Sequence, residues 1–395
     1  MTTFRTTADQ HTRRRAVSFA MVVVSLVMMM GMASMTVDIG MMYRARNEAQ
    51  ASADAAAMAA AWRLMDQNRL RGPSYVTSVT AAARQAAVDY ASYNVIINDA
   101  PVLDSNTGNS TSGDVVVGRL VDPDDANEDL DFTDPSRFNA VHVLLHRDDI
   151  RNGPIELYFA AVFGHEDSEI SASATAAFFD GVIGWNVTES TGNAGVLPLA
   201  LHVDAWNALL AGTLTSGDSY SYDASNGNVT GGSDGILELN LYPGAGTGQL
   251  PPGNFGTVDI GSPNNSTSVI ANQILYGLTE SDLAYHGGTL ELGSDGTLPL
   301  NGDTGLSAQL KDPLTEIIGK PRAIPIFNQV AGNGEGAMFT VVGWVGVRIM
   351  NVKLTGSMSS KRVIIQPAYL LDDSAVVSEN TGQSSFVFKP VQLVR

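Results

Sequence analysis

The feature that most constrains this chain is an uninterrupted apolar segment near its N-terminus. Residues 16–37 read AVSFAMVVVSLVMMMGMASMTV, which is 22 residues without a charged side chain. A helix of that length would extend about 33 Å at roughly 1.5 Å per residue, enough to cross the hydrocarbon core of a bilayer. A secretory signal peptide would have a shorter apolar run and a clear small-residue cleavage site. The segment therefore predicts an uncleaved, single-pass transmembrane helix.

The charges on either side of this segment predict its orientation. Arg13, Arg14 and Arg15 stand immediately before it, and Arg44 and Arg46 follow it in the company of acidic residues. Positive residues are retained on the cytoplasmic side of a membrane. The N-terminus is therefore expected in the cytoplasm, and the chain beyond the segment outside it.

Asp38 follows the apolar segment directly, where the helix should leave the hydrocarbon. We expect its carboxylate to lie in interfacial water. The alternative is a contact with a basic group of a neighbouring subunit. Asp38 and the three arginines before the segment are therefore our topology residues, and the sequence indicates no catalytic, cofactor-binding or metal-ligating residue.

Two helices are expected after the membrane segment. Residues 43–65 contain no Gly or Pro and are dominated by Ala, the strongest helix former, so the membrane helix should continue as a helical stalk. Gly72 and Pro73 should interrupt it. Apolar residues then recur at helical spacing over residues 74–94. These two helices are expected to pair as a hairpin.

The rest of the chain indicates β structure, because short apolar runs alternate with Asp, Asn, Gly, Ser and Thr. Strands are predicted at 114–118, 141–145, 156–162, 236–241, 255–260, 323–327, 338–350, 362–371 and 385–393, and helices at 268–276 and 306–318. The last four strands are expected to form one closing sheet. The predicted fold class is α+β, with sandwich-like β-rich domains outside the membrane. The predicted divisions are a cytoplasmic N-terminus (1–15), the transmembrane helix (16–37), a helical stalk (38–100), a small β-rich unit (101–180) and a larger β-rich domain (181–395).

Composition excludes several classes of function. The chain has 23 Lys and Arg against 41 Asp and Glu, a net charge of −18, which repels nucleic-acid phosphates. It has no cysteine, so thiolate metal sites and cysteine nucleophiles are excluded. Neither nucleic acid nor a cofactor is expected as a partner.

Three motifs resemble functional sites without meeting their requirements. The acidic segment 122–134 has Asn127 where a calcium loop of the EF-hand type needs glycine. His142 and His146 lie in a strand pattern, which separates them by roughly 13 Å, too far for one zinc ion. Asp303, in Asp-Thr-Gly, matches one half of an aspartic-protease pair, so two chains would have to supply the two carboxylates.

The N-terminal third resembles the TadE/TadG-like family of Flp pilus-assembly proteins, which belong to the tight-adherence system. The resemblance rests on the three arginines before the apolar segment, on Val37-Asp38-Ile39-Gly40 at its end, and on the run from Glu48 to Ala61. Shorter patches extend it more loosely, at 139–143, 163–164, 171–176, 198–201 and 253–256. The von Willebrand A metal motif of larger TadG members is absent, since Val376 stands where a serine is needed.

The resemblance implies a non-enzymatic inner-membrane protein with a periplasmic domain. Its implied partners are the membrane and other envelope or pilus-assembly proteins, with a homo-oligomer as a further option. The chain lacks the acidic residue that pilin-like members carry near the start of the apolar segment, so processing and polymerisation as a pilin are not expected. Two other functions stay open: an extracytoplasmic module that binds carbohydrate or calcium, and a membrane-bound aspartic protease.

Overall fold

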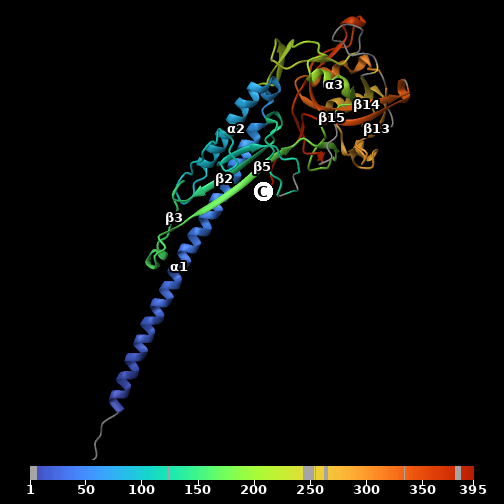
Figure 1. The fold of residues 1–395 in the computed structure, drawn as a ribbon. Coiled ribbons are helices and arrows are strands. Elements are labelled where there is room, and N and C mark those ends of the chain that lie inside the picture. The colour runs from blue at the N-terminus through green and yellow to red at the C-terminus, as the bar shows by residue number, and fades with distance from the viewer. Residues whose placement is uncertain are drawn as a thin grey trace, which may run out of the picture. The chain divides into compact units, whose positions relative to one another are not determined.

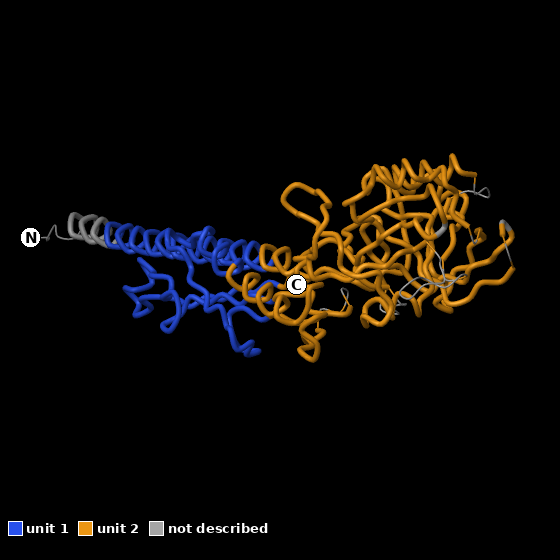
Figure 2. The backbone as a smooth tube through the Cα atoms, turned by 90° about the horizontal axis from the view of Figure 1, so that it is seen from above, with its two compact units in different colours: residues 1–57, 86–116, 142–174 blue, residues 58–85, 117–141, 175–395 orange. Residues whose placement is uncertain are grey.

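The structure is a computed structural model with two compact units (Figure 2). It describes residues 7–122, 125, 127–242, 253, 255–261, 266–303, 305–332, 334–378 and 384–395. Unit 1 comprises Met1–Ala57, Ala86–Val116 and His142–Ala174, and unit 2 comprises Met58–Gln85, Val117–Val141 and Thr175–Arg395.

One helix, α1, runs without interruption from Thr7 to Leu64, a length of 58 residues (Figure 1). It contains the single segment of the described chain that is long and apolar enough to cross a membrane. The predicted continuation of the membrane helix into a stalk is therefore confirmed. A short 3-10 turn, η1 (Gln67–Arg71), follows and ends at Gly72, whose φ of 122° is one that side-chain-bearing residues rarely adopt.

The second helix, α2 (Pro73–Tyr93), confirms the second helical prediction. It begins at a proline, whose missing N–H is not needed in the first turn. In unit 1 the Ser52 hydroxyl of α1 donates a hydrogen bond of 3.1 Å to the Ala91 carbonyl of α2. Alanines on both helices are fully buried, and in unit 1 these are Ala45, Ala49, Ala53, Ala56, Ala57, Ala87 and Ala91. Small side chains thus let the two backbones approach closely, as expected for the hairpin.

A larger side chain at this helix contact should be destabilising. Ser52 is fully buried, so Ser52→Leu inserts volume where the two backbones approach each other and removes the hydrogen bond to Ala91. We expect a loss of about 1–3 kcal/mol in the free energy of unfolding. Urea unfolding of the full-length protein in detergent measures it. Ser78→Leu, on the exposed face of α2, is the matched control and should change the midpoint little. Equal effects of the two substitutions would contradict close helix packing at Ser52.

Five strands form a sheet of order β1-β2-β5-β19-β17. Their bounds are β1 (Val115–Gly118), β2 (Ala140–Arg147), β5 (Ile170–Phe179), β17 (Leu370–Leu371) and β19 (Val387–Leu393). The predicted strands near 115 and 143 are confirmed. The final predicted strand was expected to belong to the closing sheet, and this prediction is wrong. Strand β19 pairs with β5 instead, with Lys389 opposite Phe179.

A larger sheet in unit 2 has the order β10-β16-β15-β13-β11-β7-β14, and β14 also pairs with β15. The strands are β7 (Leu199–His202), β10 (Leu239–Asn240), β11 (Phe255–Val258), β13 (Leu298–Asp303), β14 (Pro321–Ala331), β15 (Ala337–Lys353) and β16 (Arg362–Pro367). Because β14 lies beside both β7 and β15, five of these strands close into a ring. The predicted strands at 323–327 and 338–350 are confirmed, and both extend further than predicted.

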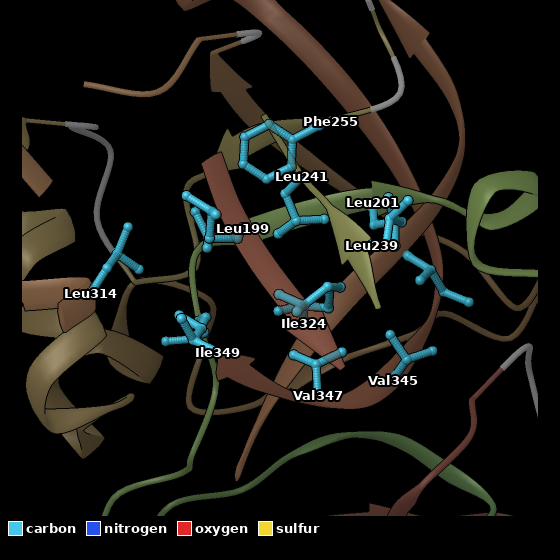
Figure 3. Packing of buried hydrophobic residues seen from close by; sticks show 14 of the residues in the cluster. Leu199, Leu201, Leu239, Leu241, Phe255, Leu314, Ile324, Val345, Val347 and Ile349 are labelled. Carbon is cyan, nitrogen blue, oxygen red and sulfur yellow. The ribbon is translucent and has the colours of Figure 1, made fainter. Parts of the chain in front are cut away.

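Alternate residues of these strands divide between two hydrophobic cores. In one core Leu199, Leu201 and Ile324 pack with Leu314 from a helix (Figure 3). Trp206, from another helix, belongs to the same core. The helices of unit 2 are α3 (Val203–Leu210), α4 (Thr267–Tyr276), α5 (Glu280–Ala284) and α6 (Lys311–Glu316). The predictions near 268–276 and 306–318 are confirmed, and α3 and α5 were not predicted.

The other core lies against a three-stranded sheet of order β12-β6-β18. These strands are β6 (Val182–Trp185), β12 (Leu290–Glu291) and β18 (Ala375–Val377). Trp185 and Trp344 meet edge to face with ring centroids 5.7 Å apart, and the Trp344 indole N–H donates to the Ile183 carbonyl at 3.2 Å. Large aromatic side chains therefore tie β6 to β15.

Two small hairpins complete the strands: β3 (Ile155–Glu156) with β4 (Asp167–Ser168), and β8 (Tyr220–Asp223) with β9 (Asn228–Gly231). The strand predicted over residues 156–162 is wrong beyond Glu156. A 3-10 turn, η3 (Ala160–Phe163), includes the last three residues of that range instead. The remaining 3-10 turns are η2 (Pro135–Arg137), η4 (Ala308–Leu310), η5 (Gly334–Gly336) and η6 (Met358–Ser360). Strands and helices in these proportions confirm the α+β class.

Candidate functional site

The most unusual group in unit 1 is the carboxylate of Asp38. It lies on α1 directly after the apolar segment, and no described side chain from Ser18 to Val37 is buried. Asp38 itself is only 4% exposed. The expectation of a carboxylate in interfacial water is therefore wrong.

Asp38 is buried because it caps the turn between β3 and β4. Its Oδ1 accepts the N–H of Tyr158 at 3.0 Å, and its Oδ2 accepts the N–H groups of Phe159 at 2.9 Å and Ala160 at 2.6 Å. These donors lead into η3, whose first N–H groups have no partner within the turn. Gly164, with a φ of 85°, ends the turn.

The electrostatics of Asp38 follow from these contacts. Burial raises the pKa of its carboxyl, but the hydrogen bonds from Ala160, Phe159 and Tyr158 outweigh that effect and hold the pKa below its usual value. The ionised form is thus the one that fits the site. A carboxylate held by three backbone N–H groups binds its own chain rather than a substrate.

A second carboxylate binds α1 to unit 1 about ten residues further along. Glu48 Oε2 accepts the N–H of Ile97 at 2.8 Å, and Glu48 Oε1 accepts from Arg44 Nε at 2.7 Å. Burial raises the pKa of Glu48, whereas the hydrogen bonds from Ile97 and Arg44 lower it to a net value below the usual one. Ile97 has a φ of 47°, which is uncommon for a β-branched residue.

Gln50 and Ser52 continue the same row of contacts. Gln50 Nε2 donates to the Ser173 carbonyl at 2.9 Å, and Ser52 donates to Ala91. We call Asp38, Glu48, Gln50 and Ser52 the clasp. Its four polar side chains bind α1 to three separate stretches of unit 1, near residues 91–97, 158–160 and 173. The clasp fixes one end of the apolar segment to the folded unit.

The other topology residues, Arg13, Arg14 and Arg15, belong to α1. Their side chains lie outside the described part of the structure, so their role in orientation stays a prediction.

The two histidines lie in a strand, as the sequence indicated. His142 and His146 lie on β2, on one face of the strand, and both are half-buried. Asp303 is the last residue of β13, and its Oδ1 accepts the N–H of Gly305 at 3.1 Å, which closes a turn. Thr304 lies outside the described residues.

Carboxylates of the acidic segment 122–134 also serve local turns where they are described. Glu128 accepts from the N–H groups of Val121 and Asp122, and Asp134 caps η2 by accepting from the Ser136 N–H at 3.0 Å. Residues 123, 124 and 126 lie outside the described part. Over the described residues, no group of three or more His, Cys, Asp or Glu side chains is placed to hold a metal ion.

Unit 2 contains a cavity of about 650 Å³ with an arginine beside it. Arg69 is 6% exposed and donates to the carbonyls of Leu64 at 3.1 Å and Ser136 at 2.8 Å. Its Nε has no hydrogen-bond partner among the described residues. Burial lowers the pKa of Arg69. Aromatic side chains form much of the remaining wall, and they are Phe138, Phe178, Tyr369, Phe386 and Phe388.

A cluster of three carboxylates in unit 2 organises the β8–β9 hairpin. Asp218 accepts from the N–H of Gly235 at 2.9 Å, and Asp234 accepts from the N–H of Tyr222 at 3.2 Å. Glu238, only 1% exposed, accepts from the N–H of Tyr220 at 2.6 Å. The conformation of the hairpin thus depends on acids that accept backbone hydrogen bonds.

The pKa of Glu238 is shifted in the opposite direction to that of Asp38. Burial raises it, the N–H groups of Tyr220 and Ser219 lower it in part, and the carboxylates of Asp218 and Asp234 raise it further, so the net shift is upward. The folded state therefore favours the protonated form. The contribution of Glu238 to stability is present at low pH and is lost as the pH rises through its folded pKa.

Glu238→Gln should remove this pH dependence. The amide oxygen can accept the same N–H groups as Glu238 Oε1 without carrying a charge. We expect the variant and the parent protein to unfold at similar urea concentrations at about pH 4, near the usual pKa of a glutamate, and the variant to be more stable at about pH 7. A difference between the two proteins that is the same at both pH values would contradict the assignment.

Comparison with known proteins identifies families for the N-terminal part of the chain. A family described as putative Flp pilus-assembly TadE/G-like matches residues 16–63. A second family, described as putative Tad-like Flp pilus-assembly, matches residues 59–176. Neither the curated proteins nor the solved structures gave a match. The two matches together include α1 from Ala16 onward, α2, every residue of the clasp and the turn that Asp38 caps. They confirm the resemblance seen in the sequence over this range.

Proposed function

We propose that this chain is a non-enzymatic scaffold of Flp pilus assembly, anchored in the inner membrane. The proposal is supported by the match of residues 16–63 to the TadE/G-like family and of residues 59–176 to the Tad-like family. The observation that carries the proposal is that two parts of α1 differ in the burial of their side chains. From Ser18 to Val37 its side chains are uncharged and none is buried, whereas Ala45, Ala49 and Ala53 further along the helix are fully buried. The same helix therefore serves as membrane anchor and as core element of unit 1.

The clasp supports a mechanical role. A flexible linker between a membrane segment and a folded domain would let the domain tumble freely. Here the first residue after the apolar segment, Asp38, already binds the backbone at Tyr158, Phe159 and Ala160. A force on unit 1 is thus transmitted directly to the membrane helix, because no flexible linker separates the two. A scaffold requires this property.

The proposed location follows from charge. Arg13, Arg14 and Arg15 favour a cytoplasmic N-terminus, so unit 1 and unit 2 would lie in the periplasm. There they would contact other pilus-assembly proteins. We propose no catalytic step, because Asp38, Glu48 and Asp218 each accept hydrogen bonds from the backbone of their own chain.

Site-directed crosslinking tests this function. The chain has no cysteine, so a single Cys can carry a maleimide photocrosslinker on the full-length protein in native membranes. Ile150 in unit 1 and Tyr276 in unit 2 are 89% and 65% exposed and suit Ile150→Cys and Tyr276→Cys. We expect crosslinks to pilus-assembly components, identified by mass spectrometry. The cysteine-free parent protein, treated identically, is the control. Recovery of only the proteins found with this control would contradict the proposal.

A further inference from the structure

The turn capped by Asp38 exposes an unusual amount of apolar surface. We call residues 158–163 the exit turn. Four of its six side chains are large, apolar or aromatic, and exposed: Tyr158 (67%), Phe159 (41%), Val162 (81%) and Phe163 (70%). Contiguous apolar surface of this kind is rare on the water-exposed face of a protein and marks a contact with a partner or a membrane.

The position of the exit turn identifies its partner. The three hydrogen bonds to Asp38 place the turn beside the residue that directly follows the apolar segment. Figure 1 shows the β3–β4 hairpin at the end of the unit 1 strands that is nearest the N-terminal part of α1. A transmembrane helix spanning residues 16–37 would bring the exit turn to the bilayer surface.

The composition of the β3–β4 hairpin fits a position at the bilayer surface. Its base is polar and exposed, with Glu156, Glu166 and Asp167 beside the paired strands. Its tip carries Val162 and Phe163. Aromatic rings favour the region between lipid headgroups and hydrocarbon, where one part of the ring is apolar and another is hydrated. The order from acidic base to apolar tip is the one expected for a loop that enters a membrane from the water side.

We propose that the exit turn inserts Val162 and Phe163 into the bilayer leaflet in which the transmembrane helix ends, so that the chain contacts the membrane at two points. The second contact would restrict tilting of unit 1 relative to the membrane, because the exit turn would have to leave the lipid for the unit to tilt away. The ionised carboxylate of Asp38 would hold the exit turn at the required depth. This inference rests on the membrane anchoring of α1 in the proposed function.

Nitroxide scanning of the full-length protein tests the inference directly. Single cysteines at Val162→Cys and Phe163→Cys would be spin-labelled after reconstitution into vesicles of phosphatidylethanolamine and phosphatidylglycerol. Electron paramagnetic resonance then compares collisions with oxygen, which concentrates in lipid, and with a water-soluble nickel chelate. We expect the oxygen-to-chelate ratio at both positions to be several-fold higher than at Ile150→Cys, which is exposed in the same unit.

A label within the apolar segment separates failure of this inference from failure of membrane anchoring. Val24→Cys should report the most lipid-rich environment of all, and a water-like ratio there would overturn the anchoring itself. If Val24→Cys lies in lipid but the labels at Val162 and Phe163 match Ile150, the exit turn does not enter the membrane. Shielding of the two labels from both reagents would equally overturn the proposal, since it would place the exit turn against protein.

Discussion

Replacing Asp38 with alanine is expected to release the exit turn from α1 while leaving the helix intact. The substitution leaves the N–H groups of Tyr158, Phe159 and Ala160 without their acceptor. Chymotrypsin cleaves after aromatic residues, and Tyr158, Phe159 and Phe163 are already exposed. Once the cap is lost, local opening should raise the cleavage rate at this turn roughly tenfold or more, because proteolysis follows the population of the open form. Timed digestion of the full-length protein in detergent, with mass spectrometry of the fragments, measures the rate.

A matched control uses another aspartate of the same helix. Asp54 accepts a hydrogen bond only from the Gln50 side chain in the contacts that the structure gives it, four residues earlier on α1. Asp54→Ala should leave cleavage at the exit turn unchanged. Asp38→Asn should give an intermediate rate, because one oxygen can still accept while the amide nitrogen faces an N–H donor. Cleavage of Asp38→Ala at the parental rate would show that the exit turn does not depend on the clasp.

Replacing Arg13, Arg14 and Arg15 together with alanine is expected to disturb the orientation of the chain. Without them, Arg44 and Arg46 on the far side of the apolar segment would become the dominant nearby positive charges. Because the bias in Lys and Arg sets the direction of insertion, roughly half of the chains or more should then insert with the reverse orientation. Ile150→Cys in the same chain reports the result through labelling of intact cells by a membrane-impermeant maleimide.

The single substitution Arg46→Ala controls for a general effect of removing positive charge. It removes charge from the opposite side of the apolar segment, so Ile150→Cys should remain fully accessible from outside. Unchanged labelling in the triple alanine variant would show that the three arginines do not determine the topology.

The two N-terminal helices could be predicted from sequence because their determinants are local. The uncharged run over residues 16–37 and the Ala-rich run over 43–65 each favour a helix without help from distant residues. Helix α5 was not predicted, although it carries a local signal in the capping box of Thr279 and Asp282. Helix α3 carries no such signal, because its N-cap is His202, which is outside the usual set of capping residues.

The clasp could not be predicted because its partners are distant in sequence. Asp38 binds the N–H groups of residues 158–160, which lie 120 to 122 positions away. The apolar residues from Glu156 to Val162 have the composition of a strand, and that local preference favoured the wrong prediction. The capping carboxylate from α1 and Gly164 select a 3-10 turn instead. The available signal in the sequence was Asp38, a charged residue within an otherwise continuous helical pattern. This signal does not identify the backbone groups that Asp38 binds.

The prediction of the strand that pairs with β19 was wrong for a similar reason. Its alternating sequence predicts a strand without naming a neighbour, and β5, with which it pairs, ends more than two hundred residues earlier in the chain, at Phe179. In unit 2, by contrast, β14 and β15 are consecutive along the chain and form one long antiparallel pair, as the sequence indicated. Neighbours in sequence were predictable as neighbours in space, and distant ones were not.

The central claim, an assembly scaffold that acts only when anchored, is tested most directly by counting pili on cells. Native host cells that lack this chain would receive either the full-length protein or residues 38–395 behind a cleavable signal peptide, which releases them into the periplasm. Equal accumulation and equal protease resistance of the two forms must first be established. The scaffold account predicts that the full-length chain restores pili and that the released form does not. Restoration of pili to the same number by the released form would contradict it.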